Sequence, residues 1–465
     1  MPSEHFKFGG GAAATALNPA VLLLILIVGL VVLLRPHRSV IIPFFAISIL
    51  VPMDQVLLVG GLHFPMLRLL ALFGIVRLIW EKSRSKRIFT GGMTKIDYAL
   101  IAFVLSTAVA GVLLFREWGE IVYQFGEIYT AFGLYFLFRF LIRDKEDVQR
   151  MIRTFALIAP LIAAVMIWEV KTGTNPYAML GGARSNFYAK LMARDDRFRA
   201  VGCFGGPITA GTFGAVVAPL FVLLWRENKR NRLIAAIGLA ATAVIIATSN
   251  SSTPILAYGS GLFAICLWPI RQWMRVIRWA IATGVVFIQL FWNHPVWYLI
   301  SKVDISGGSS SWHRYALIDQ CVKHFWDWWL VGVKSTADWG WDMWDTANQY
   351  VGVCDASGLL PFIIFMAILV YGFKYLGRAR KRADTKKEQL FFWMLGACLF
   401  ANVVSFFGIS YWDQTQVVWY GLLAAISAVA VHIDRTAVAT TQSRATTHKT
   451  AWPIEVAQQA VPMSR

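Results

Sequence analysis

The sequence predicts an all-α polytopic membrane protein with about 12–13 transmembrane helices and a large Trp-rich periplasmic loop. Three observations support this fold class: 57% of the 465 residues are hydrophobic, these residues form long uninterrupted blocks, and Lys and Arg gather in alternate connections. A block of about 20 apolar residues crosses a hydrocarbon core roughly 30 Å thick. Only helices and closed barrels satisfy their backbone hydrogen bonds there. Long blocks without alternation therefore predict helices.

Thirteen apolar blocks follow one another along the chain. They lie near residues 19–34, 39–53, 65–80, 97–115, 121–142, 151–170, 208–225, 233–248, 252–269, 275–292, 358–376, 388–409 and 416–432. The block at 39–53 is short and contains Pro43, so twelve spans is the alternative. The first block has no basic region before it and no small-residue cleavage site, which predicts a retained span and not a signal peptide.

The positions of the basic residues predict the orientation. The net charge of +18 comes largely from clusters at 35–38, 81–87, 143–150, 226–232, 271–278 and 378–387. Loops rich in Lys and Arg stay on the cytoplasmic side and attract anionic lipid. The charge therefore indicates membrane topology and a lipid partner, and we expect no nucleic-acid partner.

The remaining connections would face outward. The segment 51–65 has no Lys or Arg, 249–252 is a short Ser-rich turn, and two loops are long, at 171–207 and 293–357. We assign residues 1–435 to one membrane domain that includes these two loops. Residues 436–465 are rich in Ala, Thr, Gln and Ser, which predicts a disordered cytoplasmic tail.

The five cysteines give no metal-binding pattern, because none occurs in a CxxC pair. Three of them, Cys203, Cys321 and Cys354, fall in the two long outer loops, where oxidation is possible and one disulfide remains an open alternative. Nucleotide-binding and zinc-protease motifs are also absent from the sequence. We expect neither a metal nor a cofactor.

The loop 293–357 is rich in tryptophan, which disordered segments lack. Its tryptophans are Trp297, Trp312, Trp326, Trp328, Trp329, Trp339, Trp341 and Trp344. One interpretation is an interfacial tryptophan belt, and the other is that some rings stack on sugar faces. Helical spacing over 312–333 places Ala316, Ile318, Cys321, Val322 and Phe325 on one side, which predicts an amphipathic helix.

Two arginines in the outer loops are candidates for binding an anion. Arg199 lies just before the block 208–225, and Arg314 lies near the start of the amphipathic helix. A guanidinium group binds phosphate or pyrophosphate oxygens in a two-pronged geometry and keeps its charge when partly buried. The alternatives are an ion pair with Asp195, Asp196 or Asp319, or contact with a lipid headgroup.

At these residues the chain resembles the O-antigen ligase and O-antigen polymerase superfamily. Four elements within roughly 199–370 carry the resemblance: Arg199-Ala-Val-Gly202-Cys-Phe204, the turn Thr248-Ser-Asn-Ser-Ser252, Trp312-His-Arg314 followed by Gly332-Val, and Asp345-Thr-Ala-Asn348-Gln-Tyr350 with Gly358-Leu-Leu. The family's ligases usually carry His where this chain has Ala347, and the Ser-rich turn often ends in Arg where Ser252 and Thr253 stand here. These departures favour polymerase-like transfer over transfer to lipid A core, and His313 or His324 could substitute for the missing histidine.

The resemblance implies metal-independent transfer of a glycan at the periplasmic face of a bacterial inner membrane. The donor would be an undecaprenyl-pyrophosphate-linked oligosaccharide and the acceptor a glycan, during assembly of O-antigen or exopolysaccharide. Arg199 and Arg314 would stabilise the leaving pyrophosphate. If they share one diphosphate, their guanidinium groups should lie within about 10–15 Å of each other.

Carboxylates and aromatic rings supply the other candidate roles. Asp345 is the candidate base for the acceptor hydroxyl, with Asp338, Asp342 and Asp319 as alternatives; helix capping and solvation would explain these aspartates without a catalytic role. The candidate substrate contacts are Trp312, Asp338, Trp341, Asn348 and Tyr350.

Two other function classes remain open. A transporter or flippase of lipid-linked glycans would place ionisable or polar groups within its spans, and Glu120, Glu127, Glu169 and Asn402 keep this class under consideration. A sensor or scaffold in a polysaccharide export complex is the third class.

Overall fold

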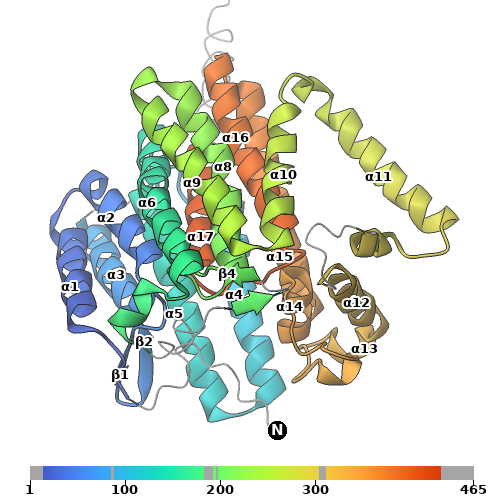
Figure 1. The fold of residues 1–465 in the computed structure, drawn as a ribbon, viewed down its shortest axis with the longest axis horizontal. Helices are drawn as coiled ribbons and strands as arrows, with labels where there is room; N and C mark the ends of the chain where they lie inside the picture. The colour runs from blue at the N-terminus through green and yellow to red at the C-terminus, as the bar shows by residue number, and fades with distance from the viewer. Residues whose placement is uncertain (1–13, 85–87, 183–191, 195–196, 303–309, 431–465) are drawn as a thin grey trace, which may run out of the picture.

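Helices dominate the protein, which is described here by a computed structural model (Figure 1). The structure describes residues 14–84, 88–182, 192–194, 197–302 and 310–430. The first helices are α1 (Pro19–Leu34), α2 (His37–Leu50), α3 (Met66–Arg84), α4 (Lys95–Phe115), α5 (Trp118–Leu141) and α6 (Lys145–Thr172). The middle of the chain forms α8 (Pro207–Glu227), α9 (Arg232–Ser249), α10 (Ser252–Cys266) and α11 (Met274–Phe291). The last third forms α12 (Ser310–Lys323), α13 (Phe325–Trp328), α14 (Gln349–Ser357), α15 (Leu359–Arg382), α16 (Lys386–Ser405) and α17 (Thr415–Ala425).

Each of the thirteen apolar blocks coincides with a helix. Within the described residues, seven helices are long and apolar enough to cross a membrane: α4, α6, α8, α9 with the turn before it, α11 with the turn before it, α15 and α16. Four more apolar helices are shorter, namely α1, α2, α10 and the helix at Thr415–Val429. The chain thus has the helix content and helix lengths of an all-α, multi-pass membrane protein.

Two short hairpins lie among the helices and were not expected from the sequence. In the first, β1 (Val56–Val59) pairs antiparallel with β2 (Leu62–Pro65), and Gly60 and Gly61 form the two-residue turn with φ of 57° and 80°. A Gly-Gly turn with positive φ at both positions matches the twist of a hairpin. The second hairpin joins β3 (Met192–Arg194) to β4 (Arg197–Arg199), so Arg199 ends a strand.

Charged groups inside the helical bundle are paired. Arg139 of α5 and Asp97 of α4 are both fully buried, with 3.0 Å between Arg139 Nε and Asp97 Oδ1. The hydroxyl of Tyr135 also donates to Asp97. A buried charge without a partner is costly, so this pair fixes α4 against α5.

The basic connections lie together at one end of the bundle, here called the basic end, at the top of Figure 1. Ion pairs join connections that are distant in sequence, namely Arg38 with Asp144 and Lys145 with Glu388. Hydrogen bonds join Gln149 with Glu227 and Arg380 with the carbonyl of Arg271. Arg226, Arg271 and Lys386 line one surface hollow. The predicted alternation of the loops therefore corresponds to a real separation in space.

The other connections lie together at the opposite end, here called the loop end. Its bonds also join distant segments: Gln55 Nε2 to Gly181 O at 2.9 Å, Ala200 N to Thr248 O at 3.0 Å, Gln349 N to Phe406 O at 2.8 Å, and Gln414 Nε2 to Cys203 O at 2.6 Å. Both long loops and the Ser-rich turn thus belong to one structure. The predicted tail at 436–465 lies outside the described residues.

Candidate functional site

The Ser-rich turn at 249–252 is the meeting point of the two candidate arginines. Asn250 takes a left-handed conformation with φ of 43° and ends α9, and α10 begins at Ser252. Arg199 donates from Nη2 to the Ser251 hydroxyl and from Nε to the Ser249 carbonyl at 3.4 Å. Arg314 donates from Nη1 to the Ser252 hydroxyl at 3.2 Å.

Ser251 and Ser252 are consecutive residues, whose Cα atoms are about 3.8 Å apart across a trans peptide. The Ser251 hydroxyl accepts from Arg199, which precedes α11 in the chain, and the Ser252 hydroxyl accepts from Arg314, which follows α11. The structure therefore brings Arg199 and Arg314 to one short turn at the loop end.

Glu169 holds the segment that carries Arg199. This carboxylate, at the C-terminal end of α6, is 2% exposed. It accepts hydrogen bonds from the backbone N–H of Gly202 at 2.7 Å and of Val201 at 3.1 Å, and from Asn175 Nδ2 at 2.8 Å. Carboxylates that accept several buried N–H bonds fix local backbone strongly. Sequence reasoning considered Glu169 only as a possible group on a transport path.

Asp413 and Gln414 hold the same segment from the other side. Asp413 is fully buried and accepts from Gly205 N at 3.0 Å while it caps α17 through Thr415. Gln414 donates to the carbonyls of Cys203 and Val51. Sequence analysis missed both residues, although an Asp two residues before an apolar helix is a recognisable capping signal.

Arg314 is buried, with 8% of its surface exposed, although it lies in a long loop where an arginine is ordinarily exposed. It lies on the inward face of α12 with Ser311, Leu317 and Cys321. A side chain at Gly408 would approach Arg314 Nε to 3.0 Å and Thr253 Oγ1 to 2.2 Å, so α12 packs closely on the segment 406–411. Replacement of Arg314 therefore affects packing as well as charge.

The loop 293–357 has an apolar core of its own, around α12, α13 and α14. Ala316, Leu317, Cys321, Trp328, Trp339, Met343, Val351 and Cys354 form this loop core. The predicted amphipathic helix exists as α12, but Val322 is 51% exposed and Leu317 takes the inward position instead. Two glycines with positive φ allow the backbone segments of this loop core to pack closely. A Cβ atom at Gly332 would lie 2.3 Å from Asp355 O, and one at Gly358 would lie 2.7 Å from Leu330 O.

Seven of the eight tryptophans of this loop divide into two groups, and the eighth, Trp297, is half-buried and donates from Nε1 to Asp319 Oδ1 at 3.2 Å. Trp328 and Trp339 are buried in the loop core, and Trp328 Nε1 donates to Cys321 O at 2.7 Å. Trp312, Trp326, Trp329, Trp341 and Trp344 are exposed, from 40% for Trp329 to 81% for Trp341. The exposed group has ring faces that a sugar or a lipid headgroup region could contact.

The acidic segment 338–345 lies beside α12. Asp338 and Asp345 are exposed, and His313 bonds through Nε2 to the carbonyl of Asp342 at 2.8 Å. The pKa of Asp345 is raised because neighbouring protein displaces part of its hydration and Asp342 adds negative charge, while His313 opposes the shift. His313, next to Arg314, thus connects the candidate base segment to the helix that carries the candidate anion ligand.

Asn348 and Tyr350 have structural contacts. Asn348 is fully buried and caps α14, because its Oδ1 accepts from Tyr350 N at 2.9 Å and Val351 N at 3.2 Å. Tyr350 donates from its hydroxyl to Val403 O at 2.9 Å and packs on Phe407. The structure places both residues in the scaffold that supports the loop end.

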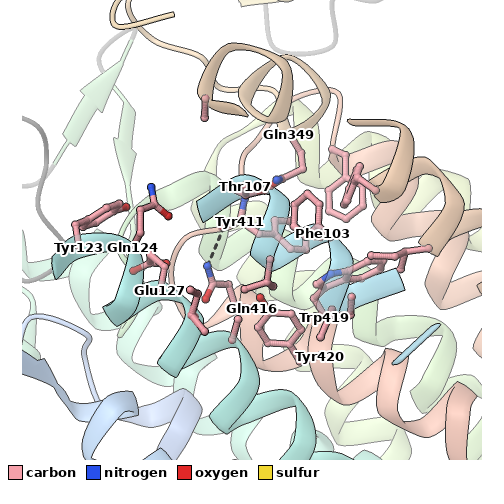
Figure 2. A pocket seen from close by; sticks show the side chains of 18 residues that line it. Phe103, Thr107, Tyr123, Gln124, Glu127, Gln349, Tyr411, Gln416, Trp419 and Tyr420 are labelled. Atoms are coloured by element: carbon pink, nitrogen blue, oxygen red, sulfur yellow. Dashed lines mark hydrogen bonds between the residues drawn. The ribbon is translucent and has the colours of Figure 1, made fainter. Parts of the chain in front are cut away.

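A cavity of about 250 Å³ lies between α4, α5, α14, α15 and α17 (Figure 2). Its wall is mostly apolar, with Thr107, Gln124, Glu127, Gln349, Tyr411 and Gln416 among its polar side chains. Gln349 accepts from Tyr411 N at 2.7 Å, and Gln416 donates to Tyr411 O at 3.2 Å. Phe406 and Tyr411 line the cavity, and Gly408 between them packs against Arg314. One segment therefore borders both the cavity and the candidate site.

Within the part of the chain that the structure describes, no three His, Cys, Asp or Glu side chains form a group that could hold a metal ion. Metal independence of the chemistry stays a prediction. No protein-family model matches the chain, and a search of curated proteins gives no significant match. The function must therefore be argued from the geometry of the loop end.

Proposed function

We propose that the protein transfers a glycan from an undecaprenyl-pyrophosphate-linked oligosaccharide to an acceptor glycan at the periplasmic face of a bacterial inner membrane, in polymerase-like chain assembly. One observation carries this proposal: Arg199 and Arg314 converge on the turn 249–252. Departure of a lipid pyrophosphate needs positive charge where negative charge develops. Two guanidinium groups held on one turn meet that requirement.

In the proposed reaction the acceptor hydroxyl attacks the anomeric carbon of the donor sugar. The new glycosidic bond forms as the bond from that carbon to the pyrophosphate oxygen breaks, and the lipid pyrophosphate leaves with the electron pair. The hydroxyl proton passes to a base, for which Asp345 is the candidate. The raised pKa of Asp345 makes it a better proton acceptor than an ordinary aspartate.

The orientation of the bundle supports the periplasmic location. Clustered Lys and Arg favour the cytoplasmic side, so the basic end would face the cytoplasm and the loop end the periplasm, with twelve or thirteen spans between them. The cavity beside segment 406–411 offers an apolar space next to the candidate site. A lipid-linked donor arriving through the bilayer would need such a space.

The transporter alternative depends on polar groups within the helices. The structure gives each of the four groups a protein partner: Glu120 with Gln124, Glu127 with Arg68, Glu169 with Gly202, and Asn402 with Tyr411. Groups with such partners have a structural explanation, and this favours the enzyme over the transporter.

Turnover of a lipid-linked oligosaccharide by the purified protein in liposomes tests the proposal. We expect wild type to extend the glycan, and Arg314→Ala and Arg199→Ala to lower the rate by about 10²–10³, the usual cost of removing one transition-state donor. Arg314→Lys should fail almost as badly, because an ammonium group lacks the planar fork. Lys323→Ala is the matched control, since Lys323 lies on the same helix with its side chain 63% exposed.

Because Arg314 is buried, thermal unfolding of each variant must accompany the rates. A folded Arg314→Ala variant with wild-type turnover would contradict the proposed role of this arginine. A wild-type protein that moves lipid-linked glycan across the bilayer without extending it would support the transporter instead.

A further inference from the structure

Two cysteines of the loop core meet between α12 and α14. Cys321 and Cys354 are each 5% exposed and belong to the same apolar cluster as Leu317 and Trp328. The Cys321 side chain is close enough to Cys354 to influence the titration of its thiol. A disulfide requires Cα atoms about 4.4–6.8 Å apart with side chains directed at each other. Two buried cysteines of one small cluster, on helices that pack together, are candidates for that geometry.

The backbone around both cysteines is held in place. Cys321 O accepts from Trp328 Nε1 at 2.7 Å, and Cys354 O accepts from Gly358 N at 2.9 Å. Next to Cys354, the carbonyl of Asp355 accepts from Val333 N at 2.7 Å. The backbone positions of the two cysteines are therefore set by the fold of the loop.

The other three cysteines have different surroundings. The Cys203 thiol is hydrogen-bonded with Tyr177 beneath the Arg199 segment, and the Cys398 thiol contacts Asn402 within α16. Cys266 is exposed at the end of α10 that leads to the basic end. These three residues give an internal comparison for any measurement of thiol state.

We propose that Cys321 and Cys354 form a disulfide in the mature protein, made while the loop 293–357 folds in the oxidising outer compartment. This inference rests on the periplasmic position in the proposed function. Disulfides persist in the periplasm and are rare in the cytoplasm. A covalent bond here would join the helix that carries Arg314 to α14, which precedes the span α15.

The chemistry requires an oxidant, namely a thiol–disulfide exchange protein in its disulfide form. One cysteine thiolate attacks a sulfur of that disulfide, and a mixed disulfide forms. The second thiolate then attacks the mixed disulfide, which leaves the Cys321–Cys354 bond and the oxidant as a dithiol; two electrons have passed to the oxidant, and the two thiol protons have been released. The neighbouring Cys321 side chain and, after it, burial raise the pKa of the Cys354 thiol, so the bond should form before the loop core closes.

The bond would position Arg314. Cys321 follows Arg314 by seven residues, which is two helical turns, and both side chains lie on the inward face of α12. A link at Cys321 therefore restricts rotation and sliding of α12 over the segment 406–411. It would also close a loop of about 30 residues, and such closure stabilises a fold mainly by restricting the unfolded chain.

Differential labelling of thiols tests the proposal. Cells that express the protein are quenched in acid, the protein is denatured and alkylated with one maleimide, then reduced and alkylated with a second, isotopically distinct maleimide. We expect Cys321 and Cys354 to carry the second label, and Cys203, Cys266 and Cys398 to carry the first. In Cys321→Ser and Cys354→Ser the remaining partner should change to the first label.

Two results would overturn the inference: the first label on both Cys321 and Cys354 in wild type, or the second label on Cys321 in the Cys354→Ser variant. As an independent measurement, reduction should lower the unfolding midpoint of purified wild type and leave that of a Cys321→Ala, Cys354→Ala double variant unchanged. An unchanged wild-type midpoint would also count against the bond.

The outcomes also separate this inference from the proposed function. Free thiols in a protein whose loop is periplasmic by reporter fusion would refute the disulfide alone. A disulfide in a protein without glycan turnover would refute the proposed function alone.

Discussion

The two ends of the bundle use charge differently. At the basic end two ion pairs that join distant connections are partly exposed: the side chains of Arg38 and Asp144 are 58% and 36% exposed, and those of Lys145 and Glu388 are 28% and 34% exposed. Asp147 is the buried exception there, and it pairs with Arg150. At the loop end Glu169, Asp413 and Arg314 are buried, and each bonds to a specific backbone or hydroxyl group. Charge at the basic end therefore indicates orientation, whereas charge at the loop end builds a site.

The largest expected effect is on the assignment of the two ends to two compartments. Reporter fusions after residues 85, 230 and 382 should read cytoplasmic, and fusions after 185 and 330 should read periplasmic, because clustered Lys and Arg are retained inside. These signals are all-or-none. A cytoplasmic signal after residue 330 would remove the loop end from the side where lipid-linked glycans are used.

The second prediction compares one carboxylate from each end. Glu169→Ala should destabilise the protein strongly, because each buried N–H left without an acceptor costs roughly 1–3 kcal/mol. Glu388→Ala should cost at most about 1 kcal/mol, the usual contribution of a partly exposed ion pair. Thermal unfolding of the purified variants in detergent measures both, and equal losses would show that the two ends do not differ in this way.

The third prediction concerns pH at the loop end. Burial raises the pKa of Asp355 to about 7. Because this value is above the ordinary value of 3.8, the unfolded chain loses the proton first as pH rises. The contribution of Asp355 to the free energy of unfolding is therefore fully present below about pH 4. It amounts to roughly 4 kcal/mol at most, and it is lost as the pH rises from about 4 to about 7.

Asp355→Asn should remove that part of the pH dependence. The difference in unfolding midpoint between variant and wild type should grow in favour of the variant from pH 4.5 to pH 8. Glu388→Gln at the basic end is the control. Parallel profiles for Asp355→Asn and wild type would show that Asp355 is not buried as a neutral acid.

The sequence predicted the helices and the separation of the ends well, because both depend on long patterns. Blocks of about 20 apolar residues and repeated basic clusters extend over many residues, so one atypical residue does not change the prediction. The interior of the loop end was predicted less well. Local spacing does not show whether Asn348 caps a helix or binds a substrate. It also does not show whether Arg314 is exposed or buried, because that depends on tertiary contacts such as the packing of Arg314 against Gly408.

The role of Glu169 likewise depends on tertiary contacts. A carboxylate near the end of an apolar block is compatible with a transport path or with a structural role, and only the fold shows the Gly202 N–H in front of it. By contrast, Arg199 and Arg314 could be selected from sequence, because an arginine in a predicted outer loop opposes the usual charge bias and requires an explanation.

The most direct test of the central claim is whether Arg199 and Arg314 recognise one diphosphate. Binding of a prenyl pyrophosphate and of the matching prenyl monophosphate should be measured by titration for wild type, Arg199→Gln, Arg314→Gln and the control Lys323→Gln. We expect wild type and the control to prefer the diphosphate, and each arginine variant to lose about tenfold or more of that preference, since hydrogen bonds to charged groups contribute roughly 1.5–3 kcal/mol. An undiminished preference for the diphosphate in both folded arginine variants would contradict the claim.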